Sequence, residues 1–331
     1  MGAVTIEASP APCTASLFAF RDPALNPNAS IAVGTASWTD KSLLASKRFY
    51  PPSANTAEAR LRYYTTQFPL VEVDAGFYAM PTPARSVLWC ERTPPSFIFN
   101  VKPFRLFTGH QTPVSSLDAD IRQALPAGLP ATVFIDQVPS DIVDELWRRF
   151  LLSLDPLRMA DKLGMVHFQF PPWVRNDARG RARIADCVSH MEDMTAGVEL
   201  RHHSWFASPA TTASTLAFER ELGVVHTVVD SPQGFDNTVP DIWAATHPEL
   251  ALVRLHGRNQ AAWNASGPAS SSRFNYDYAP HELAELAEHI RRLAQKIERT
   301  HVVFNTNYQD QGMRNAKGLM SALDASLPLL N

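Results

Sequence analysis

The chain has 331 residues, of which 45% are hydrophobic and 19% are charged, and its formal net charge is −3. This composition is typical of a globular protein that buries a full core. The charge balance gives no field that would by itself hold nucleic acid or an anionic membrane. No apolar run is long enough to span a bilayer, so we expect no membrane partner.

Cysteine use and the first residues indicate a reducing compartment. Cys13, Cys90 and Cys187 show neither the CxxC spacing of a zinc site nor the density of a disulfide scaffold. The first thirty residues contain several prolines and no apolar stretch typical of a signal peptide. We therefore expect a cytoplasmic protein in which residues 1–29 form a flexible leader and residues 30–331 form one domain.

Short apolar runs alternate with longer helical patterns from Ile31 onward. The runs predict strands at 31–36, 70–75, 97–102, 164–170, 196–201, 223–230, 250–256 and 301–306. The longer stretches predict helices at 56–67, 82–92, 139–162, 181–193, 208–222, 280–299 and 312–326. Thr82 before Pro83 is typical of a helix start. This alternation indicates βα units and a parallel sheet.

Seven of the apolar runs end in polar side chains two or four residues apart. The pairs are Glu72 and Asp74, Asn100 and Lys102, His167 and Gln169, Glu199 and Arg201, His226 and Asp230, Arg254 and His256, and Asn305 and Asn307. Because side chains of a strand alternate between its faces, each pair should lie on one face. So many ionisable groups gathered from distant segments indicate a ligand-binding or catalytic site.

Eight strands in about 300 residues, with polar endings that continue through the last strand, predict a (β/α)8 TIM barrel rather than an open doubly wound sheet. No GxGxxG or GxxxxGK[ST] follows any of the strands. Dinucleotide-binding and P-loop sites are therefore not indicated. The longest connection, from Pro103 to Pro139, is predicted to cross the barrel mouth.

A series of sequence blocks supports the same fold. They are GTASW at 34–38, FYP at 49–51, FPLVEVDAGFYAMP at 68–81, FIFNVKPFRLFTGH at 97–110, LGMVHFQFPP at 163–172, GVELRHHSW at 197–205, VVDSP at 228–232, LVRLHGR at 252–258 and VVFNTNYQDQGMRNA at 302–316. In this order the chain resembles the YecE-like family, grouped as domain of unknown function 72. The resemblance implies a (β/α)8 barrel and no particular reaction.

The chain departs from the pattern of that family at three places, one of which is Thr108-Gly109-His110, where the usual Thr-His pair is loosened. The family commonly has Gly where this chain has Ser37, directly before Trp38. It commonly has Asn-Ser-Thr where this chain has Asp74, Ala75 and Gly76. The additional carboxylate of Asp74 is expected to alter the choice of ligand.

Catalytic groups of TIM-barrel enzymes lie at the C-terminal ends of the strands, where these polar residues are expected. The predicted catalytic residues are Glu72, Glu199, Asp230 and His256, and the predicted ligand-binding residues are Trp38, Tyr78, Lys102, Gln169, Arg201, Trp205, Arg254 and Asn305. Lys102, Arg201 and Arg254 would hold a small polar anion such as a phosphate or carboxylate. A glutamate beside arginine stays ionised and suits a base, whereas His256 beside Arg254 is biased toward the neutral form.

Three alternatives stay open at this point. The charged groups could be an ion-paired ring without a ligand. No cofactor is expected, but Glu72, Glu199, Asp230 and His256 could instead bind a divalent metal for a hydrolase or isomerase, although no HxH or HExxH spacing supports this.

The third alternative is a non-catalytic protein that binds a nucleotide or single-stranded nucleic acid through aromatic rings at the mouth. These rings are Trp38, Phe77, Tyr78, Trp173, Trp205, Trp263 and Tyr308. The acidic balance of the chain weighs against nucleic acid. The leading hypothesis is thus an enzyme for a small polar anion, with isomerase, lyase and hydrolase chemistry all open.

Overall fold

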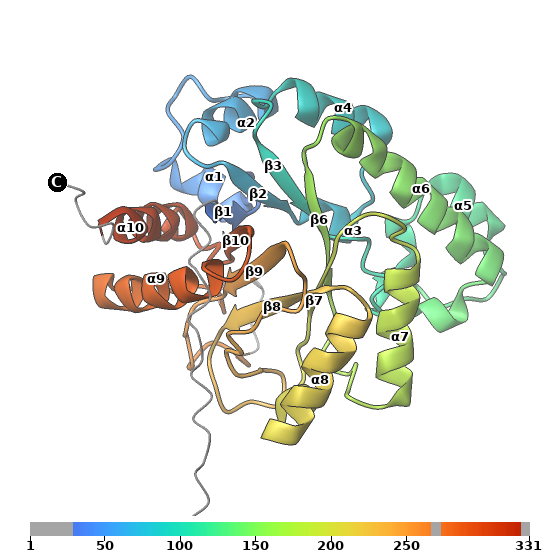
Figure 1. The fold of residues 1–331 in the computed structure, drawn as a ribbon. Helices are drawn as coiled ribbons and strands as arrows, with labels where there is room; N and C mark the ends of the chain where they lie inside the picture. The colour runs from blue at the N-terminus through green and yellow to red at the C-terminus, as the bar shows by residue number, and fades with distance from the viewer. Residues whose placement is uncertain (1–28, 266–272, 326–331) are drawn as a thin grey trace, which may run out of the picture.

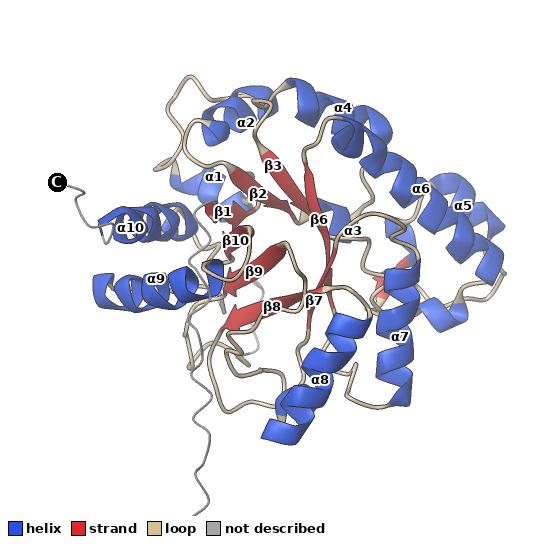
Figure 2. Cartoon of the chain, viewed as in Figure 1, coloured by secondary structure: helices blue, strands red, loops and turns tan. Residues whose placement is uncertain are grey.

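Eight parallel strands close into a barrel, and the helices surround it (Figures 1 and 2). The barrel strands are β1 (Ser30–Ala36), β2 (Leu70–Val73), β3 (Ile98–Val101), β6 (Leu163–Gln169), β7 (Ala196–Glu199), β8 (Val225–Asp230), β9 (Leu250–Leu255) and β10 (Arg299–Phe304). Their order around the barrel is β1-β10-β9-β8-β7-β6-β3-β2. The predicted TIM barrel and its eight strands are confirmed. This computed structural model describes residues 29–265 and 273–325, so nearly all of the predicted leader lies outside the described residues.

The helices lie mainly between successive strands. They are α1 (Lys41–Ser46), α2 (Ala57–Thr65), α3 (Ala75–Tyr78), α4 (Pro83–Glu91), α5 (Ala119–Ala124), α6 (Ser140–Met159), α7 (Ala178–Ser189), α8 (Pro209–Glu221), α9 (Pro280–Ala294) and α10 (Gln311–Ala325). All seven predicted helices are present, and the Thr82 hydroxyl accepts the backbone N–H of Arg85 at the start of α4. The short helices α1, α3 and α5 were not predicted, because six residues or fewer give too little periodicity. Across the described ranges, no helix is long and apolar enough to cross a membrane.

The long connection from Pro103 to Pro139 was expected to cross the barrel mouth, and most of it does not. It contains α5 and a two-stranded antiparallel sheet of β4 (Thr112–Pro113) and β5 (Thr132–Val133). This part packs outside the barrel, because Arg149 of α6 binds Asp118 and Asp120 at the start of α5. The first residues and the end of the connection remain beside the mouth, where the His110 ring contacts Phe77 and the rings of His110 and Phe134 contact Trp173.

Two hydrophobic clusters divide the interior. The larger one lies between the strands and the helices. The smaller one lies within the barrel and comprises Ala36, Leu70, Met165, Val225, Leu250, Leu252 and Val303. This division follows from strand geometry, since alternate residues face the lumen and the helices. Apolar packing therefore fills the lower lumen and leaves the C-terminal half to polar groups.

Gly34 of β1 allows the close approach of β1 to β2. A Cβ atom at this position would lie 2.0 Å from the carbonyl oxygen of Leu70. Because the obstructing atom belongs to the backbone of a paired strand, it has little freedom to move.

We expect Gly34→Ala to lower the free energy of unfolding by about 3 kcal/mol through overpacking. Gly318→Ala in α10 is the matched control, because its added methyl would meet only the flexible end of Leu283 of α9 and alanine favours a helix. Urea titrations of both variants measure the difference. Equal stabilities of the two variants would contradict the proposed strand contact.

Candidate functional site

The polar strand endings meet inside the barrel. Arg254 of β9 contacts Glu72 of β2, although these two strands are not neighbours in the sheet. The contact therefore crosses the lumen. Hydrogen bonds also join His301 to Asn100 and Lys102 to Gln169. The expectation that polar groups from separate strands converge is confirmed for β2, β3, β6, β7, β9 and β10.

Arg254 is the centre of this network. Its Nη2 donates to Glu72 Oε1 at 2.5 Å, and its Nη1 donates to Glu199 Oε2 at 2.5 Å. All three side chains are 0% exposed. Buried charges of this kind are tolerated only when they are paired and hydrogen-bonded. One planar guanidinium thus fixes carboxylates from two distant strands.

Arg201 and His256 extend the network toward the mouth. The Nε of Arg201 donates to Glu199 Oε1, and its Nη2 lies 3.0 Å from His256 Nε2. The same imidazole nitrogen lies 3.3 Å from Glu199 Oε1. Asn305 contacts the other ring nitrogen of His256 at 2.9 Å. The predicted ligand residue Asn305 therefore positions His256.

The electrostatics agree with the ionisation states expected from the sequence. Burial alone would raise the pKa values of Glu72 and Glu199, but neighbouring arginines, above all Arg254 and Arg201, outweigh it and hold both pKa values well below their usual range. Burial, together with Arg201, lowers the pKa of His256 to about 3. The two glutamates are therefore ionised and His256 is neutral near pH 7.

His167 completes the buried network, because it lies between the same two glutamates that Arg254 joins. Its Nδ1 lies 3.1 Å from Glu72 Oε2, and its Nε2 lies 3.7 Å from Glu199 Oε2. The hydroxyl of Thr227 is 3.3 Å from the same Nε2. Despite these carboxylates, burial lowers the pKa of His167. The imidazole therefore fills the space between the two glutamates without adding a charge at neutral pH.

The carboxamide oxygen of Gln169 receives hydrogen bonds from three cationic groups. Lys102 Nζ lies 3.0 Å away, Arg254 Nη1 lies 3.2 Å away and Arg201 Nη2 lies 3.3 Å away. We call Lys102, Gln169, Arg201 and Arg254 the cation cradle. The side chains of Lys102 and Arg201 are 8% and 11% exposed, so the cradle reaches solvent at its upper edge.

Asp74 borders the cation cradle and was not among the predicted site residues. Its Oδ1 lies 3.1 Å from Lys102 Nζ, and its side chain is 23% exposed. Burial raises the pKa of Asp74 even though Lys102 opposes this effect, and Glu72 raises it further. The sequence contained the necessary signal, because Asp74 shares its alternation with Glu72.

Asp230 does not belong to this site, which corrects its predicted catalytic role. Its Oδ1 accepts a hydrogen bond from Arg258 at 2.9 Å, and its Oδ2 accepts one from the Tyr278 hydroxyl at 2.5 Å. In β8 the lumen is instead faced by Val225 and Thr227. The two predicted residues of β8, His226 and Asp230, lie on the outer face, where His226 binds Glu219 of α8 at 2.9 Å.

The predicted aromatic contacts divide into buried and exposed rings. Trp205 is fully buried, and its Nε1 donates to the Val174 carbonyl at 2.9 Å, so the prediction that it binds ligand is wrong. Trp38 packs against Trp89 and borders a cavity of about 340 Å³ beside Asp74. Tyr78 is exposed at the mouth.

Arg105 was also missed from the sequence. Its guanidinium lies 5.5 Å from the Phe77 ring and 6.0 Å from the Tyr78 ring. No ion pair is formed by Arg105 with any residue in the described ranges. Because Arg105 follows β3 by several residues, strand alternation gave no indication of its position.

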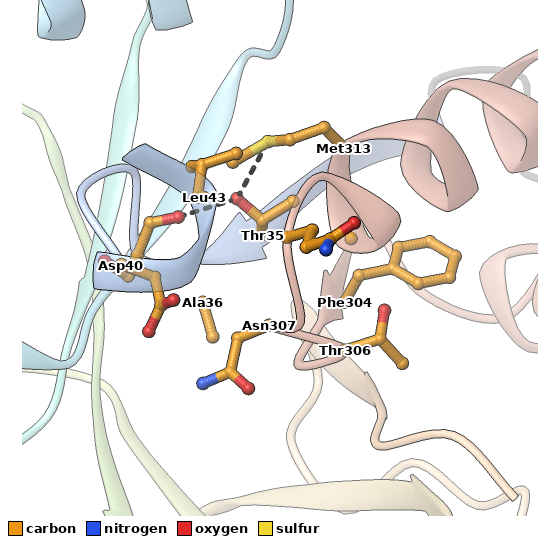
Figure 3. Close-up of a pocket in the computed structure, with 11 residues that line it drawn as sticks. Thr35, Ala36, Asp40, Leu43, Phe304, Thr306, Asn307 and Met313 are labelled. Atoms are coloured by element: carbon orange, nitrogen blue, oxygen red, sulfur yellow. Dashed lines mark hydrogen bonds between the residues drawn. The ribbon is translucent and has the colours of Figure 1, made fainter. Parts of the chain in front are cut away.

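Figure 3 shows a second, very small cavity between the ends of β1 and β10. It has a volume of about 10 Å³ and is lined in part by Thr35, Thr306 and Asn307. This space suits one water molecule and no larger ligand. Ser37 at its edge has a φ of 82°, which is a strained conformation for a residue other than glycine.

The metal alternative lacks its predicted ligand set. Asp230 points away from the lumen, and Arg254 occupies oxygens of both Glu72 and Glu199. In residues 29–265 and 273–325, no group of three or more His, Cys, Asp or Glu side chains is arranged to hold a metal ion.

Fold and site together define a TIM-barrel protein with an ion-paired lumen and a candidate site at the C-terminal mouth. A family model described as "Protein of unknown function DUF72" matches residues 32–329. The chain belongs to the DUF72 family.

Relatives of the chain agree with this assignment. The UPF0759 protein YunF of Bacillus subtilis (strain 168) is 32% identical over 297 residues, which cover 89% of this chain and 95% of the relative. A DUF72 family structure from Enterococcus faecalis V583 has a TM-score of 0.72 at 26% identity and covers 89% of this chain and 96% of its own. One from Thermotoga maritima MSB8 has a TM-score of 0.66 at 25% identity, covering 89% and 99%.

We expect Arg254→Met to lower the free energy of unfolding by about 3 to 5 kcal/mol, because it leaves two buried carboxylates without their shared cation. Arg149→Met is the matched control, since its ion pairs lie at the surface and contribute little. Urea titration at pH 7 measures both variants. Similar losses for the two arginines would show that Arg254 does not organise the lumen.

Stability should fall as pH decreases from about 6.5. Burial lowers the pKa of His301 to about 3, whereas an unfolded histidine has a pKa near 6.5. Between these values the unfolded state binds the proton and the folded state does not, so acid favours unfolding. We expect His301→Gln to reduce the dependence of unfolding free energy on pH by about 1 kcal/mol per pH unit between pH 5 and 6.

Denaturant titrations at several pH values measure this slope. The exposed His281, at the start of α9, provides the control variant His281→Gln, which should retain the parent slope. If the unfolding free energy of His301→Gln depended on pH as strongly as that of the parent protein, the buried imidazole would not be held neutral.

Proposed function

We propose that this protein is an enzyme that binds a small phosphate- or carboxylate-bearing substrate in the cation cradle. The proposal rests on one observation. A single neutral oxygen, Gln169 Oε1, accepts hydrogen bonds from Lys102, Arg201 and Arg254. An amide oxygen has two lone pairs and no net charge. An anionic oxygen would satisfy three cationic donors better. The substrate oxygen takes the position of Gln169 Oε1 when this side chain swings aside.

The exposure of the side chains in the cation cradle favours a ligand that approaches from the C-terminal mouth. Lys102 and Arg201 are slightly exposed, while Arg254 behind them is fully buried. Arg105 adds a positive charge at the same end of the barrel. An approaching anion would therefore meet the slightly exposed cations first and the buried guanidinium last. Such an arrangement combines attraction with a rigid binding geometry.

Asp74 is the residue best suited to general acid/base chemistry in this proposal. It lies next to Lys102, is accessible, and has a raised pKa. A bound anion would raise that pKa further, because nearby negative charge disfavours the ionised carboxyl. Asp74 would then donate a proton to the substrate and take it back after turnover.

The residues predicted as bases take supporting roles in the proposal. Glu72 and Glu199 are buried and held ionised by arginine, so they are weak bases and act by fixing the cations. His256 lies 3.0 Å from Arg201, and it positions that guanidinium or relays a proton. Isomerase, lyase and hydrolase reactions are all compatible with one acid/base group beside a bound anion.

We expect Gln169→Glu to abolish binding of inorganic phosphate and small carboxylates, because its own carboxylate would occupy the cation cradle. The same change should raise the melting temperature, since three cations gain an anionic partner. Gln169→Ala should retain binding. Calorimetric titration at low ionic strength, with thermal unfolding in parallel, measures these effects.

Gln67→Glu is the matched control, because Gln67 lies just before β2 at the opposite end of the barrel and binds Lys317. It should bind phosphate as the parent does. Undiminished phosphate binding in Gln169→Glu, or none in the parent protein, would overturn the proposal.

A further inference from the structure

Trp173 presents an exposed but fixed aromatic surface beside the barrel mouth. Its indole is 55% exposed, and its Nε1 donates to the Gly109 carbonyl at 3.1 Å. The ring also packs edge-on against His110 at 5.8 Å and Phe134 at 6.4 Å. Three contacts therefore hold a large ring in place while more than half of the residue stays exposed. A rigid, open ring of this kind is a ready surface for stacking.

A cavity of about 400 Å³ adjoins this indole. Its size falls within the range of small-molecule sites. Arg179 and Arg183 line it and both bind Asp136, at 2.6 Å and 2.7 Å. Guanidinium and carboxylate groups at the edge of an aromatic surface can donate to and accept from the polar edge of a planar ring. The cavity therefore combines a stacking face with hydrogen-bonding groups of both kinds.

A row of rings lies between the cation cradle and this cavity. Lys102 Nζ lies 5.6 Å from the centre of the Phe77 ring, which is 4.9 Å from the His110 ring. His110 in turn contacts Trp173. Along the chain, Trp173 follows Gln169 by four residues, so their Cα atoms are at most about 14 Å apart. A separation of this size is within the length of one phosphate-bearing molecule.

We propose that the substrate of this site is a nucleoside monophosphate, with its phosphate in the cation cradle and its base stacked on Trp173. This inference rests on the proposed function and specifies its ligand. A heteroaromatic base matches the open indole face, because stacking of a base on an aromatic side chain tolerates any base. The polar edge of the base then faces Arg179 and Asp136.

The test compares the affinities of adenosine monophosphate, ribose 5-phosphate and inorganic phosphate by calorimetry. We expect the nucleotide to bind at least about 10-fold more tightly than ribose 5-phosphate. Trp173→Ala should remove most of this difference and leave phosphate affinity unchanged. Trp173→Phe should retain part of it. Trp243→Ala, which removes a tryptophan stacked on His289, is the control and should bind all three ligands as the parent does.

The outcomes separate this inference from the proposed function. Equal affinities for nucleotide and ribose 5-phosphate, or no effect of Trp173→Ala, would overturn the nucleotide while phosphate binding that depends on Gln169 still stands. Nucleotide binding that survives Gln169→Glu unchanged would overturn both, because the phosphate would then lie outside the cation cradle.

Discussion

A single buried guanidinium, that of Arg254, sets the arrangement of the barrel interior. It binds Glu72 on one side of the lumen and Glu199 on the other, and none of the three contacts water. Removing one partner of a buried ion pair leaves an uncompensated charge, so Arg254 constrains the positions of both carboxylates. Arg201 then takes the remaining oxygen of Glu199, and the neutral His256 fits beside it. The positions of the outer cations follow from this inner pairing.

The polar half of the lumen differs from the apolar layers that usually fill a TIM barrel. Here the apolar cluster is confined to the lower lumen, and the remaining space holds charged and amide groups. Hydrophobic side chains of similar volume would stabilise such a space at least as well as ion pairs do. A binding or catalytic role gives a physical reason to keep charges there, and the anion site proposed at Gln169 would be such a role.

The sequence allowed the barrel and most of its lumen to be predicted, because strand alternation carries both kinds of information. Glu72, Glu199 and Arg254 were each placed by counting residues from apolar neighbours. Asp230 was misplaced because the ionisable residues of β8 face the helix side, where Glu219 and Arg258 pair with them, and alternation alone does not tell lumen from helix side. Trp205 was misplaced because its position after β7 does not show whether its side chain points to the mouth or into the core. The convergence on Gln169 depends on register and rotamers between distant strands, which local patterns do not encode.

The pairing of the first barrel strand with the last one affects how the chain folds during synthesis. β1 pairs with β2 on one edge and with β10 on the other. The chain leaves the ribosome from its N-terminus, so one edge of β1 stays open until the last strand has emerged. Glu72 likewise cannot form its ion pair until Arg254 has been synthesised, 182 residues later in the chain. Nascent chains therefore carry a hydrated carboxylate and an unpaired strand edge for most of translation, and the charged lumen becomes dry only when the ring closes.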